Sequence, residues 1–180
     1  TPGDLNKRIE QLRQNSNGRI KVHKLAVTPG GTDLLMMEIG NKKGLNNPAV
    51  LVVGNLSGTT PLATEAAMSF AEKINADAAL SSGLTFYILP SGNPDAGSRY
   101  FATPLYSDAG NKTPYNDDND DQVDEDGYND LDGNGIITQM RVKSPDATWI
   151  PVAGEARLMR KADPLKGEKG IYKLYTEGID

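Results

Sequence analysis

The sequence lacks cysteine altogether and contains a single histidine, His23. Without cysteine the chain forms no disulfide and has no thiolate nucleophile, and the redox compartment stays undecided. Zinc sites usually draw on two or more His or Cys side chains, so an ordinary zinc site built from imidazole and thiolate is not expected. His23 stands in an alternating segment, residues 20–27, and we interpret it as a structural or surface residue.

Other absences narrow the function further. No apolar run approaches the roughly 18 residues that cross a bilayer, so no membrane span is expected. No basic stripe with interleaved aromatics is present, which argues against nucleic-acid binding. A G-x-x-x-x-G-K-[ST] phosphate loop is missing. Ser57 follows an apolar run, but its turn reads G-x-x-S-G rather than the G-x-S-x-G of serine hydrolases, so a Ser-His-Asp triad is not expected.

Charge is unevenly distributed along the chain. The formal net charge is −5, yet nine of the 24 acidic residues lie between residues 117 and 132, where no Lys or Arg occurs. The other residues number 15 acidic and 19 basic. The protein therefore combines a mildly basic body with one concentrated acidic segment, which would repel phosphates and attract cations.

Hydrophobic periodicity predicts an α/β fold, with a mixed central sheet and flanking helices. Helices are expected at residues 3–15, with Asp4 as cap, and at 61–76, with Thr60 as cap. The second helix offers two apolar stripes, Leu62-Ala66-Phe70-Ile74 or Ala63-Ala67-Ala71. Strands are expected at 20–27, 33–39, 49–55 and 84–90, and shorter strands or hairpins at 136–142, 148–153, 155–162 and 170–177.

The run at 49–55 is apolar on both faces, which is typical of a central strand covered on both sides. Together with the helix at 61–76 and the strand at 84–90 it predicts a βαβ unit. Residues 91–135 have no periodicity, and a loop this long inside a domain is normally functional or ordered by an ion. We predict a single, partial domain over 1–180 with an acidic insertion at 107–142.

The acidic segment contains a calcium-binding pattern. Residues 130–137 match the first eight positions of an EF-hand-type loop, with Gly at position 6, but position 12 is Arg141 and no helix precedes the loop. Calcium takes six to eight hard oxygen ligands, which closely spaced Asp and Asn supply. One or two calcium ions, or a solvated acidic loop, are the two interpretations. The candidate ligands are Asp117, Asn119, Asp121, Asp124, Asp126, Asp130, Asp132 and Asn134.

Three segments, in their order and spacing, resemble the zinc carboxypeptidase family of the carboxypeptidase A type. GNLSGTTPLATEA (54–66) aligns without gaps with the family's G-x-x-H-G-x-E turn. LTFYILPSGNPDAG (84–97) supplies the N-P-D of the family's N-P-D-G motif as Asn93, Pro94 and Asp95. PYNDDNDDQVDEDGYNDLDGNGIITQMRV (114–142) matches the Asp-rich insert of a bacterial branch.

The resemblance implies a zinc-dependent peptidase fold, but the residues depart from the pattern. Ser57 occupies the position of the first zinc-binding residue, a His, and Thr60 that of the second, a Glu. Neutral hydroxyls bind zinc poorly. The family's S-x-x-G-R signature is replaced by TPGGTD at 28–33. The third zinc ligand and the catalytic Glu of the family fall beyond Asp180, so the chain resembles the first half of a catalytic domain, natural or trimmed.

Three hypotheses follow. The favoured one is a carboxypeptidase-like domain that has lost its zinc ligands, is stabilised by calcium, and binds a peptide or glycan or serves a structural role. The second is a working metallopeptidase completed by residues outside this chain. The third is a calcium-dependent adhesion module. A periplasmic or secreted bacterial location is expected from calcium availability and from the resemblance, since no targeting signal is present.

Overall fold

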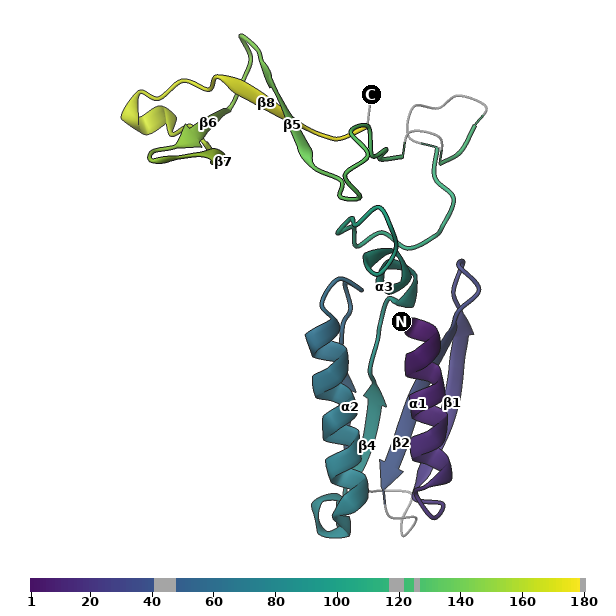
Figure 1. Cartoon of the computed structure of the whole chain (residues 1–180). Coiled ribbons are helices and arrows are strands. Elements are labelled where there is room, and N and C mark those ends of the chain that lie inside the picture. The colour runs from purple at the N-terminus through teal and green to yellow at the C-terminus, as the bar shows by residue number, and fades with distance from the viewer. Residues whose placement is uncertain (41–47, 117–121, 125–126, 179–180) are drawn as a thin grey trace. The chain divides into compact units, whose positions relative to one another are not determined.

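The computed structural model describes residues 1–40, 48–116, 122–124 and 127–178. It divides into two compact units, residues 1–114 and 115–180, which are described separately (Figure 1). Each unit contains one four-stranded sheet. The predicted mixed α/β class is confirmed, whereas the single-domain organisation stays a prediction.

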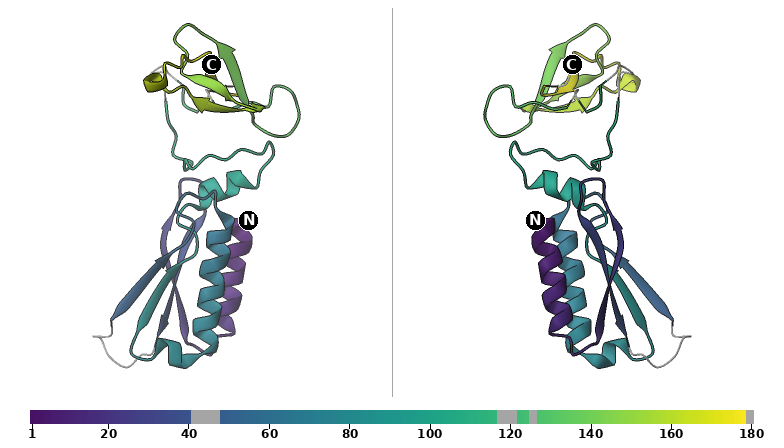
Figure 2. Two further views of the ribbon diagram at one scale, coloured as in Figure 1. Left: turned by 90° about the vertical axis from the view of Figure 1, so that its left-hand side faces the viewer. Right: turned by 90° about the vertical axis from the view of Figure 1, so that its right-hand side faces the viewer.

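The first unit is a sheet with helices on one face, as Figure 2 shows. Strands β1 (Ile20–Val27), β2 (Asp33–Gly40), β4 (Thr85–Leu89) and β3 (Ala49–Val53) lie side by side in that order. The β1–β2 and β2–β4 pairs are antiparallel and β3–β4 is parallel. Helices α1 (Pro2–Gln14) and α2 (Pro61–Ala76) pack on the sheet, and α3 (Pro94–Tyr100) follows β4. The predicted β3-α2-β4 unit is confirmed.

Helix α1 starts slightly earlier than the sequence suggested. Thr1 is the N-cap and accepts from the backbone N–H of Asp4, whose carboxylate bonds back to Thr1. Asp4 is thus the third helical residue of a capping box rather than the cap itself. Pro2 suits the first turn, where its missing N–H has no partner to lose. Ile9 is 1% exposed and anchors the helix on the sheet.

Helix α2 has the predicted bounds, but its buried face combines parts of both predicted stripes. The buried residues are Ala67, Met68, Ala71 and Ile74. Leu62 is 78% exposed and Phe70 36% exposed, so neither belongs to the core. Thr60 occupies the N-cap position without making a side-chain capping bond. Small residues on the buried face let the helix lie close to β2 and β4, which brings Met37, Ile39, Phe86 and Ile88 into one core.

Strand β3 is not the central, doubly covered strand that its composition predicts. Among the described residues it is one of the two edge strands of its sheet, and Leu51 is 64% exposed. An apolar run on both faces indicates what a strand can bury, but it does not specify which neighbours cover it.

A short helix interrupts the long segment that was predicted as a loop. Helix α3 covers Pro94–Tyr100, and its seven residues are too few to leave a periodic signal. Asn93 caps it by accepting from the N–H of Ala96 at 3.1 Å, and Pro94 is its first residue. Capping chemistry rather than periodicity therefore creates this helix.

The second unit is an antiparallel sheet of strand order β5-β8-β6-β7. Its strands are β5 (Gln139–Lys143), β6 (Trp149–Val152), β7 (Glu155–Lys161) and β8 (Tyr172–Thr176), close to the predicted short strands. Two 3-10 helices complete the assignments, η1 (Ala78–Ser81) in the first unit and η2 (Pro164–Lys166) in the second. No helix within the described part of the chain is long and apolar enough to span a bilayer.

Candidate functional site

The loop between β3 and α2 is closed by Asn55. This residue adopts a positive φ of 45° and is 8% exposed. Its amide nitrogen donates to Gly58 O at 3.3 Å and to Thr64 Oγ1 at 3.1 Å, and its Oδ1 accepts from the N–H of Thr60 at 2.9 Å. Asn tolerates the left-handed conformation better than most residues. One buried amide therefore fixes both ends of the turn and the start of α2.

Ser57 and Thr60, the two positions singled out by the sequence, lie in this turn. Ser57 Oγ accepts from Thr59 N at 3.3 Å and from Thr59 Oγ1 at 3.1 Å. Ser57 is half-buried and Thr60 is exposed. The hydroxyl of Ser57 thus serves the turn itself, and Thr60 contributes its backbone N–H to Asn55.

The turn packs directly against the start of α3. A Cβ placed on Gly58, whose φ is +77°, would lie 2.5 Å from Ala96 Cβ and 2.6 Å from Asn93 O. Only glycine allows this approach, because any side chain would overlap the neighbouring backbone. The structure therefore brings together two of the three segments that carry the family resemblance.

Asp95, the acidic member of the N-P-D motif, is buried rather than presented to solvent. It is 1% exposed and accepts from Thr28 Oγ1 at 2.6 Å, Gly30 N at 3.0 Å and Lys112 N at 3.4 Å. Burial raises the pKa of Asp95, but the hydrogen bonds, that of Thr28 foremost, outweigh it and hold the pKa below the ordinary 3.8. The carboxylate therefore joins the 28–31 turn, α3 and the segment at Lys112.

The acidic loop is folded around its first calcium-type residues. Asp130 accepts from Asn134 N at 3.1 Å and from Gly135 N at 2.8 Å. Asp132 Oδ1 also accepts from Asn134 N, at 3.0 Å, and its Oδ2 from the Asn134 side-chain amide at 2.9 Å. These bonds curl residues 130–135 into one compact turn with the carboxylates close together.

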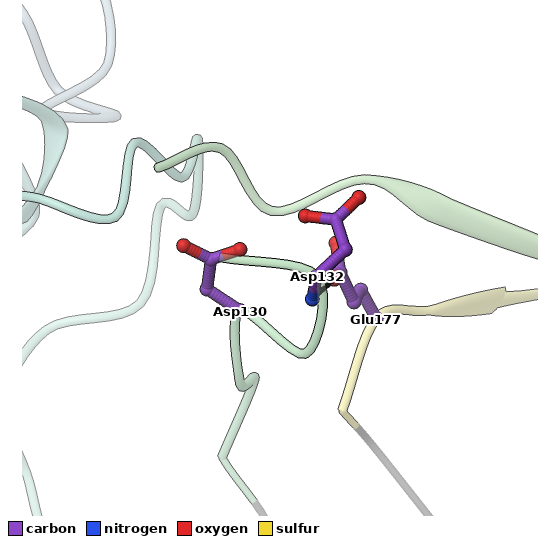
Figure 3. A group of neighbouring side chains, drawn as sticks. All are labelled: Asp130, Asp132 and Glu177. Carbon is purple, nitrogen blue, oxygen red and sulfur yellow. Dashed lines mark hydrogen bonds between the residues drawn. The ribbon is translucent and has the colours of Figure 1, made fainter. Parts of the chain in front are cut away.

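Glu177 completes this cluster, although no local sequence pattern indicates it. It arrives from the end of β8, as Figure 3 shows, and oxygens of Asp130, Asp132 and Glu177 lie within 4.8 Å of one another. Glu177 as a whole is 4% exposed. Glu177 Oε1 accepts from Leu131 N at 2.9 Å and Asp132 N at 3.2 Å, and Oε2 from Thr138 N at 2.9 Å and Thr138 Oγ1 at 2.7 Å.

These bonds explain the ionisation of Glu177. The backbone N–H of Thr138, followed by its hydroxyl, holds the pKa of Glu177 below the ordinary 4.5. Its four accepted hydrogen bonds occupy about as many lone pairs as a carboxylate offers. Glu177 therefore fastens the acidic loop to β8, while Asp130 and Asp132 retain free lone pairs.

The remaining candidate ligands are not brought into this cluster by the described structure. Asp117, Asn119, Asp121 and Asp126 lie outside the described residues. Asp124 is described and pairs with Tyr115: its Oδ1 accepts from Tyr115 N at 3.0 Å, and its own N–H donates to Tyr115 O at 2.9 Å. The described part of the chain offers no other group of three or more His, Cys, Asp or Glu side chains suited to a metal.

The family is established by comparison with known proteins. A family model described as zinc carboxypeptidase matches residues 5–134. Because this match covers well over half of the chain, the protein belongs to the zinc carboxypeptidase family, for which zinc is the expected cofactor. No match was found among curated proteins.

Several solved structures are similar to this chain. One is bovine thrombin-activatable fibrinolysis inhibitor in complex with tick carboxypeptidase inhibitor, at 15% identity and a TM-score of 0.49, covering 56% of this chain and 32% of that one. Carboxypeptidase A from Helicoverpa armigera matches at 19% identity and 0.47, covering 56% and 26%. A metallo-carboxypeptidase from Burkholderia cenocepacia matches at 17% and 0.44, covering 60% and 27%. The matched part spans about a third or less of each of these chains.

Proposed function

We propose that this chain is a carboxypeptidase-like domain that does not hold a catalytic zinc ion at the turn between β3 and α2. The observation that carries the proposal is the state of Ser57. Its Oγ already accepts two hydrogen bonds from Thr59, and a hydroxyl oxygen has two lone pairs. A zinc ion at Ser57 would have to displace bonds that close the turn.

The chemistry of the donor set supports the same conclusion. Zinc in catalytic sites is held by imidazole, thiolate or carboxylate, whereas Ser57 and Thr60 offer neutral hydroxyls. These residues do not fit the metal. The carbonyl polarisation and water activation that zinc supplies in metallopeptidases then have no source at this turn.

Zinc titration and a peptidase assay on the full-length parent protein test the proposal together, because the family's third zinc ligand and catalytic Glu fall beyond Asp180 and the 180-residue chain alone would be inactive under either hypothesis. We expect no stoichiometric zinc in calorimetry and no release of C-terminal residues from peptides. Stoichiometric zinc together with released amino acid would overturn the proposal and support a working metallopeptidase. The variant Asp130→Ala/Asp132→Ala is the control, because any zinc that this variant loses was bound at the acidic loop and not at the turn.

We further propose that calcium binds the acidic loop and stabilises it. The carboxylates of Asp130 and Asp132 lie near that of Glu177, and three such charges repel one another unless a cation offsets them. Closely spaced carboxylate oxygens with lone pairs to spare suit calcium, a hard cation. Glu177 assists by holding the loop through the N–H groups of Leu131, Asp132 and Thr138.

Calcium binding is tested by thermal unfolding with millimolar calcium or EGTA. An ion that binds only the folded state at about 100 times its dissociation constant stabilises it by about 2.7 kcal/mol. We expect a higher melting temperature with calcium, and none of this rise in Asp132→Ala. Asp146→Ala is the matched control, because Asp146 belongs to the same unit but not to the cluster, and its side chain is 83% exposed. An unchanged melting temperature in the unaltered chain would contradict the site.

The ligand and the location follow as proposals from this assignment. A peptide or glycan is the proposed ligand, and binding of the calcium-loaded chain to peptide and glycan arrays tests it. If the chain binds neither class of ligand, this proposal is rejected.

A bacterial periplasmic or secreted location is proposed because calcium sites of extracellular modules bind at about 10⁻⁴–10⁻³ M, concentrations met outside the cytosol. Recovery of the parent protein only in the cytosolic fraction would contradict this location.

A further inference from the structure

The acidic loop contains one of the two Asn-Gly steps of the sequence, Asn134–Gly135, and the other is Asn17–Gly18. An asparagine followed by glycine is prone to spontaneous deamidation, because glycine has no side chain to hinder ring closure by its own backbone nitrogen. The reaction consumes only water. Each Asn-Gly step is therefore a candidate modification site, and the local structure decides how fast it reacts.

Deamidation at Asn134 is an intramolecular substitution at the side-chain amide. The backbone nitrogen of Gly135 bonds to Cγ of Asn134, the bond from Cγ to Nδ2 breaks, and the proton of Gly135 N leaves with Nδ2 as ammonia. Water then opens the cyclic imide at one of its two carbonyls, which gives aspartate or isoaspartate. For this reaction Gly135 N must give up its hydrogen bond, and the Asn134 carboxamide must rotate toward it.

The structure holds both reacting groups in hydrogen bonds that oppose this step. Gly135 N donates to Asp130 Oδ2 at 2.8 Å. The Asn134 carboxamide is held at both ends, because its Nδ2 donates to Asp132 Oδ2 at 2.9 Å and its Oδ1 accepts from Ile136 N at 2.8 Å. Two of the three bonds are made to carboxylates, which makes them stronger than neutral ones. All three are internal to the loop, so they do not depend on what else surrounds the chain.

The charge of the loop opposes the reaction as well. Addition of the Gly135 nitrogen places negative charge on the carboxamide oxygen of Asn134. That carboxamide is bonded to Asp132, whose carboxylate lies in one cluster with those of Asp130 and Glu177. Like charges at such short range raise the energy of the intermediate. Hydrogen bonding and charge therefore act in the same direction.

We propose that Asn134–Gly135 is a latent deamidation site, which the folded acidic loop protects through the carboxylates of Asp130 and Asp132. Loss of these bonds exposes the site, and the product then disfavours closure of the loop. An aspartate at position 134 cannot donate to Asp132, and it brings a further negative charge to the cluster. An isoaspartate lengthens the backbone and moves Gly135 N away from Asp130. A loop that opens and is modified consequently does not close again as before.

Mass spectrometry of the parent protein, incubated at neutral pH, measures the deamidated fraction at each Asn-Gly step. All samples contain EGTA, so the outcome is independent of the proposed calcium site. We expect Asn134 to react about tenfold more slowly, or slower still, in the folded protein than in the same protein unfolded in urea, because a hydrogen bond to a charged group contributes about this factor. Equal rates at Asn134 in the folded and unfolded protein would overturn the proposal.

Variants identify the protecting bonds. Asp130→Ala should accelerate deamidation at Asn134 about tenfold, whereas Asp130→Asn retains an oxygen acceptor for Gly135 N and should accelerate it less. Asp146→Ala is the matched control, because Asp146 lies in the same unit but outside the cluster and its side chain is 83% exposed. Asn17 belongs to the first unit and is the internal reference, whose rate should not respond to Asp130→Ala. An unchanged rate at Asn134 in Asp130→Ala would reject protection by Asp130.

Circular dichroism before incubation shows whether Asp130→Ala is folded. If this variant is unfolded, the comparison of the unaltered protein with and without urea still decides the outcome, because it needs no substitution. The variant Asn134→Gln confirms the assignment of the modified residue: its longer side chain disfavours the five-membered ring, so the deamidated form of this peptide should disappear while that of Asn17 remains.

Discussion

Removal of the Asp95 carboxylate should destabilise the first unit by about 3–5 kcal/mol. Asp95 is 1% exposed, and its carboxylate accepts two short hydrogen bonds, from Thr28 Oγ1 at 2.6 Å and Gly30 N at 3.0 Å, and a long one from Lys112 N at 3.4 Å. A hydrogen bond to a charged group contributes about 1.5–3 kcal/mol, so the two short bonds account for most of the loss. Asp95→Ala removes them all.

Asp95→Asn separates charge from geometry. The nitrogen of the introduced amide, suitably rotated, would donate to Thr28 Oγ1, and the amide oxygen would still accept from Gly30 N. The variant should therefore lose less stability than Asp95→Ala, about 1–2 kcal/mol. Urea unfolding at pH 7, followed by circular dichroism, gives both values, and a loss below about 0.5 kcal/mol in Asp95→Ala, the usual size of a surface change, would refute the reasoning.

The pH dependence gives a second check on Asp95. Its folded-state pKa is below the unfolded value of 3.8, so the unfolded state binds the proton more tightly. The stability due to its ionisation is therefore fully present well above pH 3.8 and is lost as the pH falls through the folded pKa. Because burial opposes the hydrogen bonds, this part is smaller than the total loss in Asp95→Ala. If the difference in free energy of unfolding between the unaltered chain and Asp95→Asn grew as the pH fell, the lowered pKa of Asp95 would be contradicted.

Three further outcomes are expected. Gly58→Ala should lower the free energy of unfolding in urea by about 2–4 kcal/mol, because left-handed backbone strain adds to overlap of the new Cβ with the α3 backbone. Gly18→Ala is the control: its φ is nearly the same but its surroundings are open, so it should show the strain alone, about 1 kcal/mol. Equal losses in the two variants would contradict the overlap. Glu177→Gln should lower the melting temperature of the second unit at pH 7. This difference should fade as the pH drops below 4.5, because the pKa of Glu177 is depressed chiefly by the N–H of Thr138 and the carboxylate becomes protonated there. A difference that persists at pH 2 would contradict the stabilising role of the ionised carboxylate. Carbon-detected NMR titration should place the pKa of Glu168 at about 2, owing chiefly to the hydrogen bonds that Arg160 donates to its carboxylate. An ordinary pKa near 4.5 would show that this ion pair does not form in solution.

Periodicity predicted the elements that depend on local sequence. The bounds of α2 were predicted because Pro61 and the small apolar residues after it carry both a start signal and a helical repeat. The β1–β2 hairpin followed from alternation on both sides of the TPGG turn. In both cases the residues that decide the structure are near neighbours in the chain.

The features that escaped prediction depend on distant residues. Glu177 joins Asp130 and Asp132 only because β8 pairs with β5, next to the loop, and no local spacing connects residues more than forty positions apart. The exposure of β3 is likewise set by its place in the strand order. Four of the predicted calcium ligands, Asp117, Asn119, Asp121 and Asp126, lie outside the described residues, so their role stays a prediction.

The bonds that shape the turn between β3 and α2 suggest why its ligand positions could change without loss of the fold. Asn55 fixes the turn through Gly58 O and Thr60 N, and Gly58 lets α3 approach. Asp95 then joins α3 to the turn at Thr28 through groups that no metal would touch. None of these contacts uses the side chain of Thr60, and Ser57 bonds only within the turn. Since none of these contacts requires a metal ion, selection for folding alone would preserve the turn after the metal-binding side chains were gone, which is the situation we propose.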